Sequence, residues 1–246
     1  MSLPVFLIDA TTLRGSGRVT LGGDEGRHAA VVRRIGAGER VELTDGAGHV
    51  ARCLVTAADR NGLTCEVESR NDEPRPAPRI VVVQALPKGD RGETAVETLT
   101  EVGVDEIVPW AAARCVTRWK GERGEKTLRK WRSTAREAAK QARRSWFPEV
   151  SGLATTAEVS TRLNNADVAI VLHEDADTSL AAIDLPDGGE VILVVGPEGG
   201  VAPEELNGFE SVGAILARLG PTVLRTSTAG TVAAGNILAR TPRWPA

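Results

Sequence analysis

Hydrophobic and polar positions follow two different patterns along the chain, and the change comes near residue 73. In the first part, short β-like runs are bounded by glycine-containing turns, at residues 5–9, 17–21, 39–46, 49–55 and 63–69. Closely spaced runs of this kind predict strands joined by tight turns. We therefore expect a small β-barrel in the first part of the chain.

One segment of this first part, residues 23–35, has a helical period instead. Asp24 is a candidate N-cap, and Ala30, Val31 and Ile35 would form the apolar side of the helix. The same helix would display several basic side chains to solvent.

Apolar runs alternate with helical patterns in the second part of the chain. Runs rich in Val and Ile predict strands at 80–86, 105–111, 167–172 and 191–195, with helices between most of them. Strands buried on both faces predict a mostly parallel sheet covered by helices, which is an α/β domain. The stretch 71–78 contains three prolines and predicts the linker. We expect domains at 1–72 and 73–246.

Composition adds few restrictions to this picture. The 246 residues are 41% hydrophobic and 26% charged, as in ordinary globular proteins, and no apolar run is long enough to cross a membrane. The first residues do not resemble a signal peptide, so we expect a cytoplasmic protein. Cys53, Cys65 and Cys115 have neither zinc-site nor disulfide spacing, and we interpret them as reduced structural thiols without metal.

Charge is distributed unevenly although the net charge is only -3. Residues 114–144 contain twelve basic residues against three acidic ones. A positive field of this kind attracts phosphates, and nucleic acid becomes the leading partner, although a solvated helix face is the usual alternative. The residues that we expect to contact RNA are Arg27, Arg33, Arg34, Lys126, Arg129, Lys130, Arg136 and Arg144.

The basic segment also has an apolar stripe with helical spacing, made of Leu128, Trp131, Ala135, Ala138, Ala142 and Trp146. Because the tryptophans lie on this stripe, we interpret them as core anchors and not as platforms for base stacking.

The glycine-rich sequence GPEGG, residues 196–200, directly follows the predicted strand at 191–195. It lacks the Lys-Ser/Thr of a Walker A loop and the spacing of a Rossmann fingerprint. Glu198, Glu204 and Glu205 would repel a phosphate, so a cationic or neutral ligand fits better. Glycine would let the backbone approach a flat ligand closely, although a simple tight turn is the alternative.

A second loop follows at 219–229, with the sequence LGPTVLRTSTA, in which Thr226, Ser227 and Thr228 are cap-type residues before a final helix. Together with GPEGG, KGDR at 88–91, TEVGVDEIVP at 100–109 and EAAKQARRSWFPEV at 137–150, this loop resembles the RsmE family. These are bacterial ribosomal RNA uridine-N3 methyltransferases of the SPOUT class. The likeness extends over nearly the whole chain.

The resemblance implies a PUA-like RNA-binding barrel followed by an α/β SPOUT domain with a C-terminal trefoil knot, in a homodimer acting on 16S RNA of the small ribosomal subunit. It implies S-adenosylmethionine as cofactor. The expected cofactor-binding residues are Leu172, His173, Val195, Gly196, Glu198, Gly199, Gly200, Leu219, Gly220, Leu224 and Thr226. The chain departs from the family pattern at Thr98, where lysine is common, and at Ser227, where glutamate is common. Ser227 could still cap the final helix.

The chemistry of uridine N3 indicates which residue is needed for catalysis. Loss of the N3 proton spreads negative charge onto the flanking carbonyl oxygens, and a guanidinium would stabilise that charge. Arg225 is our candidate for this role. His173 and Glu174 are weaker candidates for a base. Two alternatives remain open at this point: a nicotinamide-dependent oxidoreductase and a non-catalytic RNA-binding or ribosome-assembly protein.

Overall fold

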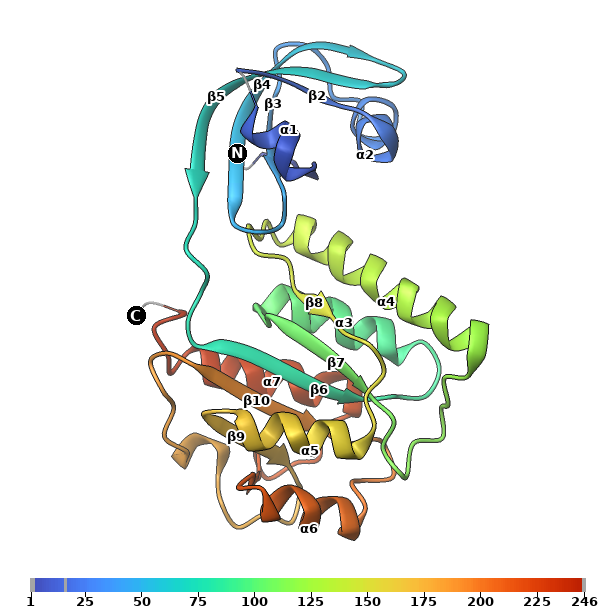
Figure 1. Cartoon of the computed structure of the whole chain (residues 1–246), viewed down its shortest axis with the longest axis vertical. Coiled ribbons are helices and arrows are strands. Elements are labelled where there is room, and N and C mark those ends of the chain that lie inside the picture. The colour runs from blue at the N-terminus through green and yellow to red at the C-terminus, as the bar shows by residue number, and fades with distance from the viewer. Residues whose placement is uncertain (1–2, 16, 245–246) are drawn as a thin grey trace. The chain divides into compact units, whose positions relative to one another are not determined.

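The computed structural model describes residues 3–15 and 17–244. The chain forms two compact units, and we describe each by itself. The first unit contains residues 1–75 and 139–147, and the second contains residues 76–138 and 148–246 (Figure 1).

The first unit is built on one five-stranded sheet in the order β1-β3-β4-β5-β2. Its strands are β1 (Val5–Leu7), β2 (Arg18–Leu21), β3 (Arg40–Thr44), β4 (His49–Asp59) and β5 (Gly62–Asp72). All neighbours are antiparallel except β1 and β3, which run parallel. All five predicted strands are therefore present, and their buried side chains form a core of their own that includes Phe6, Val19, Leu43 and Val55.

The predicted helix at 23–35 is only partly correct. It consists of α2 (Gly23–Arg27) and a π-helical turn, η1 (His28–Val32). The N-cap is Gly22, so Asp24 lies inside the first turn and does not cap the helix. A π-turn has more residues per turn than an α-helix, which shifts the predicted stripe, and Val31 is 52% exposed. A short helix that was not predicted, α1 (Ala10–Arg14), begins after Asp9, whose carboxylate accepts a hydrogen bond from Thr12 N at 2.9 Å.

Residues 139–147 belong to the first unit although they are distant in sequence. The carbonyl of Ser145 accepts a hydrogen bond from Gly48 N at 3.0 Å, and Trp146 Nε1 donates to Glu73 O at 3.0 Å. A Cβ at Gly48 would lie 2.6 Å from the indole of Trp146, so only glycine permits this contact. Trp146 thus anchors the return segment, but it is half-buried and lies outside the hydrophobic core, so the prediction of a core residue is only partly correct.

The second unit is built on a six-stranded sheet in the order β11-β9-β10-β6-β7-β8. Its strands are β6 (Arg79–Ala85), β7 (Glu106–Trp110), β8 (Glu149–Val150), β9 (Val168–Leu172), β10 (Glu190–Val195) and β11 (Ile215–Ala217). Every neighbouring pair is parallel, which confirms the predicted parallel α/β sheet.

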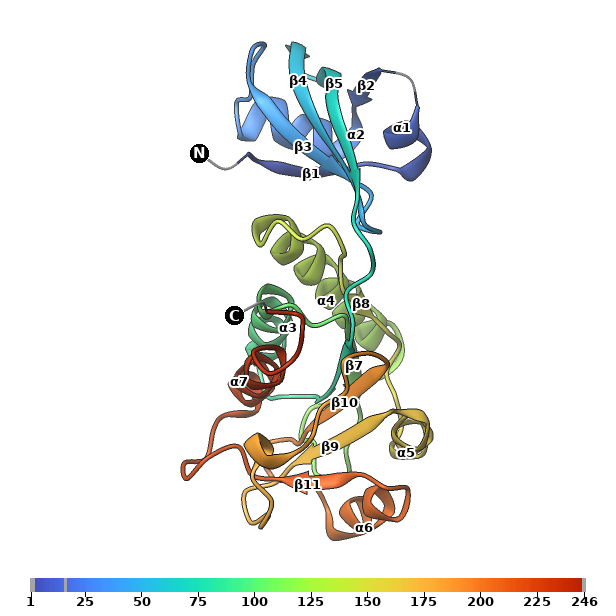
Figure 2. The same ribbon diagram turned by 90° about the vertical axis from the view of Figure 1, so that its left-hand side faces the viewer.

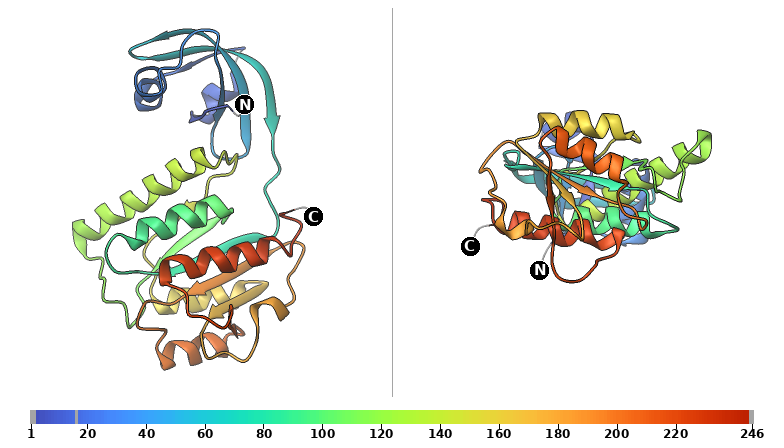
Figure 3. Two further views of the ribbon diagram at one scale, coloured as in Figure 1. Left: turned by 180° about the vertical axis from the view of Figure 1, so that it is seen from behind. Right: turned by 90° about the horizontal axis from the view of Figure 1, so that it is seen from below.

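Helices cover both faces of this sheet: α3 (Arg91–Val102), α4 (Gly121–Gln141), α5 (Thr156–Asn165), α6 (Pro203–Ser211) and α7 (Thr226–Leu238), with a 3-10 turn, η2 (Leu180–Ala182). Figures 2 and 3 show α3 and α7 on one face and α5 and α6 on the other. The helix α5 and the short strand β8 were not predicted, because residues 149–165 contain few apolar residues. Because helices cover both faces of the sheet, the central strands are buried on both sides, which explains their unbroken Val and Ile runs.

The apolar stripe of α4 is confirmed for most of its length. Leu128, Trp131, Ala135 and Ala138 are buried, and the Trp131 ring packs edge-on against Trp119. Ala142 is exposed because α4 ends at Gln141.

The start of α7 differs from the sequence prediction. Arg225 occupies the N-cap position, without a side-chain cap, and Thr226 and Ser227 already lie in the first helical turn. Ser227 therefore does not cap the helix, because the chain turns helical one residue before it.

The three cysteines are free and buried, as predicted. Burial raises the pKa of the Cys53 thiol to about 12 and that of Cys65 to about 11. Within residues 3–15 and 17–244, no helix is long and apolar enough to cross a membrane, and no cluster of His, Cys, Asp or Glu could hold a metal ion.

Candidate functional site

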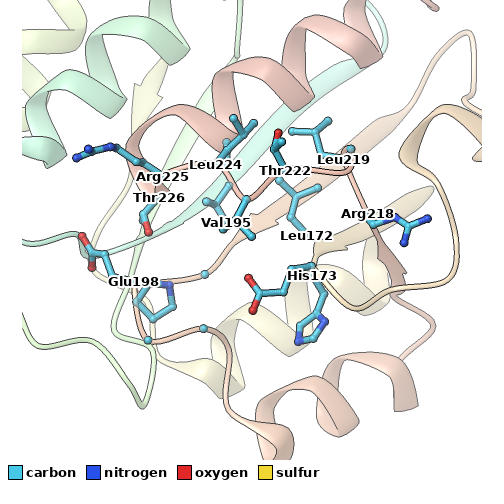
Figure 4. Close-up of a pocket in the computed structure, with 18 of the residues that line it drawn as sticks. Leu172, His173, Val195, Glu198, Arg218, Leu219, Thr222, Leu224, Arg225 and Thr226 are labelled. Atoms are coloured by element: carbon cyan, nitrogen blue, oxygen red, sulfur yellow. The ribbon is translucent and has the colours of Figure 1, made fainter.

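A cavity of about 580 Å³ lies at the carboxyl edge of the parallel sheet in the second unit (Figure 4). The loops after β9, β10 and β11 line it because neighbouring parallel strands bring their carboxyl ends to the same edge. The last of these loops leads into α7. The fold therefore joins loops that lie more than fifty residues apart in sequence.

All the predicted cofactor-binding residues line this one cavity. They are Leu172, His173, Val195, Gly196, Glu198, Gly199, Gly200, Leu219, Gly220, Leu224 and Thr226, and Arg225 lies with them. The lining also contains residues that were not predicted, among them three arginines, Arg91, Arg114 and Arg218. The shared location is a finding, and the contact of each residue with a cofactor stays a prediction.

The glycine-rich loop has a conformation that glycine makes possible. Gly200 has a φ of +72°, and its N–H donates to Pro197 O at 2.9 Å to close a turn. A Cβ at Gly196 would lie 2.8 Å from Val201 Cγ2. The loop thus presents main-chain atoms to the cavity, as expected for a surface that a flat ligand approaches closely.

The carboxylate of Glu198 connects this loop to the segment between β6 and α3. Its Oε1 accepts a hydrogen bond from Lys88 N at 3.1 Å and lies 3.7 Å from Arg91 Nη1. These contacts hold the middle of the loop. Glu198 is therefore both a wall of the cavity and a tether.

A second tether was missed from the sequence and starts at the buried Glu205. Its Oε1 accepts hydrogen bonds from Ala113 N at 2.9 Å and Thr156 Oγ1 at 2.8 Å, and its Oε2 accepts from Ala202 N. Arg114, next to Ala113, donates from Nη1 to Gly199 O at 3.2 Å. This network could not be predicted, because Glu205 occupies the first turn of α6 in the same way as the exposed Glu204.

Two arginines stand at opposite ends of the cavity. Figure 4 shows Arg225 and Glu198 at one end and Arg218 at the other, with Leu172 and Val195 between them. The main chain next to Arg225 is held by the buried Gln84, whose Nε2 donates a hydrogen bond to the carbonyl of Thr226 at 3.3 Å. A guanidinium at either end could interact with an anionic group of a bound molecule.

His173 and Glu174 both line the cavity, but His173 has a local structural contact. Its Nδ1 accepts a hydrogen bond from Asp175 N at 3.2 Å, which holds the ring against its own loop. Glu174 has an exposed side chain at the same loop. His173 thus helps to fix the loop after β9, and the base function of His173 or Glu174 stays a prediction.

Thr98, one of the two departures from the family pattern, is outside the cavity lining. Its hydroxyl is 2.7 Å from that of Thr231 and also donates to Thr94 O, so it links α3 to α7.

The residues predicted to bind RNA are divided between the two units. Arg27, Arg33, Arg34 and Arg144 belong to the first, and Lys126, Arg129, Lys130 and Arg136 to the second. All are exposed except Arg144, which is half-buried. Lys130 Nζ lies 3.0 Å from Glu93 Oε1, and the hydrogen bond to this carboxylate raises the pKa of Lys130. RNA contact by these residues stays a prediction.

Comparison with known proteins extends the description. Residues 73–238 match the RNA methyltransferase domain family, and residues 21–68 match the RNA methyltransferase PUA domain. The chain is 47% identical to ribosomal RNA small subunit methyltransferase E of Mycobacterium bovis, covering 98% of this chain and 94% of the relative. The Bacillus subtilis protein of that name is 29% identical, with 84% of each chain covered.

A solved structure of a Legionella pneumophila protein, in complex with the bound cofactor SAM, has the same fold. It superimposes with a TM-score of 0.85 at 25% identity, covering 98% of this chain and 99% of the other.

Proposed function

This chain belongs to the family of ribosomal RNA small subunit methyltransferase E, and from that premise we propose that it methylates N3 of a uridine in 16S rRNA. It is an S-adenosylmethionine-dependent rRNA methyltransferase. The observation that carries the proposal is the single cavity in which the glycine-rich loop, the loop after β9 and the loop before α7 meet. Family membership also disfavours the nicotinamide oxidoreductase and the non-catalytic RNA-binding protein.

The residues of the cavity fit S-adenosylmethionine. A volume of about 580 Å³ is in the usual range for small-molecule sites. Leu172, Val195 and Leu219 supply apolar walls for a base, and the main chain at Gly196 and Gly199 can approach a flat ring. Glu174 and Glu198 are the carboxylates of the lining, and their charge is compatible with a sulfonium.

When bound, S-adenosylmethionine supplies an electrophilic methyl group that needs no metal and no covalent enzyme intermediate. The chain's own residues then position the acceptor and stabilise charge. We assign Arg225 to the uracil, because a guanidinium beside a carbonyl oxygen stabilises the negative charge that develops as N3 loses its proton. Its N-cap position supports this: a cation there gains nothing from the helix dipole. We assign the exposed basic residues of segment 27–34 and of α4 to RNA phosphates.

The finer features of the family are part of the same proposal. We propose that the segment leading into α7 threads through a loop of its own domain as a trefoil knot. In support, β11 lies at one edge of the sheet whereas α7 packs on β6, β10 and α3. A crystal structure tests this path, because it shows whether the segment between β11 and α7 passes through a loop of the same domain.

We also propose a homodimer that works in the cytoplasm. Exposed apolar side chains near the cavity support a subunit contact, with Val223 75% and Val232 50% exposed. Light scattering at concentrations where the enzyme is active measures the mass, and a monomer there would contradict the dimer.

The test of the reaction is to map modified bases in small-subunit rRNA from cells with and without the gene. We expect one N3-methyluridine that is absent without the gene and restored by the purified protein with S-adenosylmethionine. A methyl group found on a different atom or base would refute the N3 assignment while retaining the methyltransferase.

A further inference from the structure

Two helices of the second unit end in the same hydrogen-bonded turn. At the end of α3, Gly103 N donates to Thr100 O at 3.2 Å and Val104 N donates to Leu99 O at 3.1 Å. The helix α6 ends in this way at Gly213. The glycines have φ values of +114° and +90°, which is the left-handed conformation that this turn requires.

The helix α4 ends in the same turn with an arginine in the glycine position. Arg143 N donates to Lys140 O at 3.1 Å, Arg144 N donates to Ala139 O at 2.9 Å, and the φ of Arg143 is +55°. Arg34, after η1, also has a φ of +55°. Thirteen residues among 3–15 and 17–244 have left-handed φ values; eleven are glycines and the other two are these arginines.

An arginine is the less stable choice at such a position, since a Cβ in the left-handed region is strained. Glycine occupies every other left-handed position in the part of the chain that the structure describes, so backbone geometry alone does not explain Arg34 and Arg143. Both are exposed, and neither guanidinium has a hydrogen bond or ion pair with any residue in 3–15 or 17–244. The charge is therefore available to a partner.

Both arginines belong to the first unit, and Arg143 lines a cavity there of about 290 Å³. Arg52 and Arg144 are in the same wall, with polar side chains such as Ser69 and Asn71. Of the two carboxylates in the wall, Glu73 already accepts hydrogen bonds from Ser145 and Asn71, and Glu42 is the other. Arg52 lies 3.8 Å from Glu68, so the guanidinium of Arg143 is the charge in this wall on which we rely, and a guanidinium suits a phosphodiester.

We propose that Arg34 and Arg143 contact phosphates of the RNA substrate, and that arginine is kept at these two glycine-type positions for that contact. The proposal rests on the proposed function, because it takes ribosomal RNA as the partner. It differs from an ordinary basic surface in one respect: removal of each charge should relieve strain in the fold while it weakens binding.

The test uses Arg34→Gly, Arg143→Gly and the double variant in the full-length protein. The probe is a transcript of the small-subunit rRNA. We expect each substitution to raise the thermal midpoint by about 2–4 °C. Each should also lower RNA affinity by about fourfold at 150 mM salt, and reduce the salt slope by about 0.7, the value for one phosphate contact on single-stranded nucleic acid. Affinity for S-adenosylmethionine should not change.

Two controls separate strain from charge. Gly213→Arg places an arginine in the same turn of the second unit, where a Cβ would meet nothing within 4 Å, and it should lower the thermal midpoint by a similar amount without increasing RNA affinity. Arg60→Gly removes a charge from the β4–β5 turn, at the end of the hairpin opposite to Arg52 and Asn71. It should leave RNA affinity within twofold of the parent.

Each remaining outcome overturns the proposal. Equal RNA affinity in Arg143→Gly and the parent would show that the arginine makes no contact. A lower thermal midpoint in both glycine variants would mean that the arginines stabilise their helix ends, as cations there can. An equal loss in Arg60→Gly would indicate net charge alone. If the unsubstituted protein binds no rRNA, the proposed function is refuted as well. If it binds and methylates rRNA but the arginine variants bind equally well, only the assignment of Arg34 and Arg143 is refuted.

Discussion

The main-chain N–H of Lys88 donates a hydrogen bond to Oε1 of Glu198, 3.1 Å away, across two loops that are more than a hundred residues apart in sequence. Removal of this carboxylate in Glu198→Ala frees the middle of the glycine-rich loop. We expect affinity for S-adenosylmethionine to fall about tenfold, the scale of one hydrogen bond to a charged group. Isothermal titration measures it. Glu204→Ala, at an exposed residue outside the cavity, is the control, and equal affinities for both variants would refute the tether.

Arg225→Ala should lower the methyl-transfer rate by about two to three orders of magnitude, as loss of one oxyanion donor does. Arg225→Lys should recover only part of the rate, because an ammonium lacks the planar fork. The measurement is single turnover at saturating RNA and cofactor.

Arg218→Ala is the matched control for Arg225, since Arg218 has the same charge at the opposite end of the same cavity. Its rate should stay within a few fold of the parent. Equal losses for the two variants would point to the overall field of the cavity, and a rate that extra RNA restores would make Arg225 a substrate-binding residue.

Lys126 and Arg129 on α4 should contribute to the salt dependence of RNA binding. Lys126→Glu with Arg129→Glu should weaken binding and flatten the salt slope by roughly 0.7–0.9 for each lost phosphate contact. Titrations of RNA at several salt concentrations give the slope. An unchanged salt slope would mean that Lys126 and Arg129 are solvated surface residues that do not contact RNA phosphates.

Acid should destabilise the second unit through Glu106, a buried carboxylate at the start of β7. Burial works to raise its pKa, but the Ser151 hydroxyl and the Arg79 and Arg162 guanidiniums outweigh burial and hold the pKa below the ordinary value of 4.5. A depressed pKa in the folded state stabilises the protein above the unfolded value, and this stability is lost as pH falls through the folded one.

The free energy of unfolding should therefore decrease as the pH falls below about 4.5. Glu106→Gln should remove part of that dependence and cost about 1–3 kcal/mol at pH 7, because the half-buried guanidiniums of Arg79 and Arg162 lose a charged hydrogen-bond partner. Denaturant unfolding at several pH values measures both effects. Glu149→Gln, at an exposed residue, should change neither, and a parental pH profile in Glu106→Gln would refute the assignment.

Two helical glycines should respond to alanine with opposite signs. A Cβ at Gly92 would lie 2.7 Å from the Trp131 ring, and Gly92→Ala should cost about 1–3 kcal/mol of stability as an overpacked contact. A Cβ at Gly235 would lie 3.7 Å from Val102, an ordinary contact, and Gly235→Ala should gain about 0.5–1 kcal/mol. Thermal unfolding measures both, and a gain in stability for Gly92→Ala would mean that the α3–α4 contact is softer than its geometry suggests.

The sequence predicts the strands of the second unit better than it predicts where helices begin or which polar helices are present. Strands β6, β7, β9 and β10 could be recognised because burial on both faces leaves unbroken aliphatic runs. The helix α5 could not, since only Val159 and Leu163 are buried and the rest of its surface is polar. The errors at Asp24 and Ser227 concern which residue begins a helix, and a shift of one or two positions is enough to exchange a cap for a first-turn residue.

The cavity lining could be predicted through family resemblance, whereas the groups that hold it could not. The glycine-rich loop can be recognised from its composition. Glu205 cannot, because its function depends on burial of its side chain, and Arg114 cannot, because its function depends on the direction of its side chain toward Gly199 O. Periodicity does not distinguish Glu205 from its exposed neighbour Glu204, because both occupy the first turn of α6. Only the packed arrangement reveals which of the two receives hydrogen bonds from Ala113 and Thr156.

The return of residues 139–147 to the first unit limits how this protein can be dissected or recombined. A single cut near residue 73 separates the strands of the first unit from the segment whose Trp146 packs on Gly48. A fragment of the first unit alone would leave those contacts exposed to water. Transfer of this RNA-binding unit to another enzyme would need three junctions in the gene, one after residue 75 and one on each side of the returning segment, so the two units are expected to be inherited together.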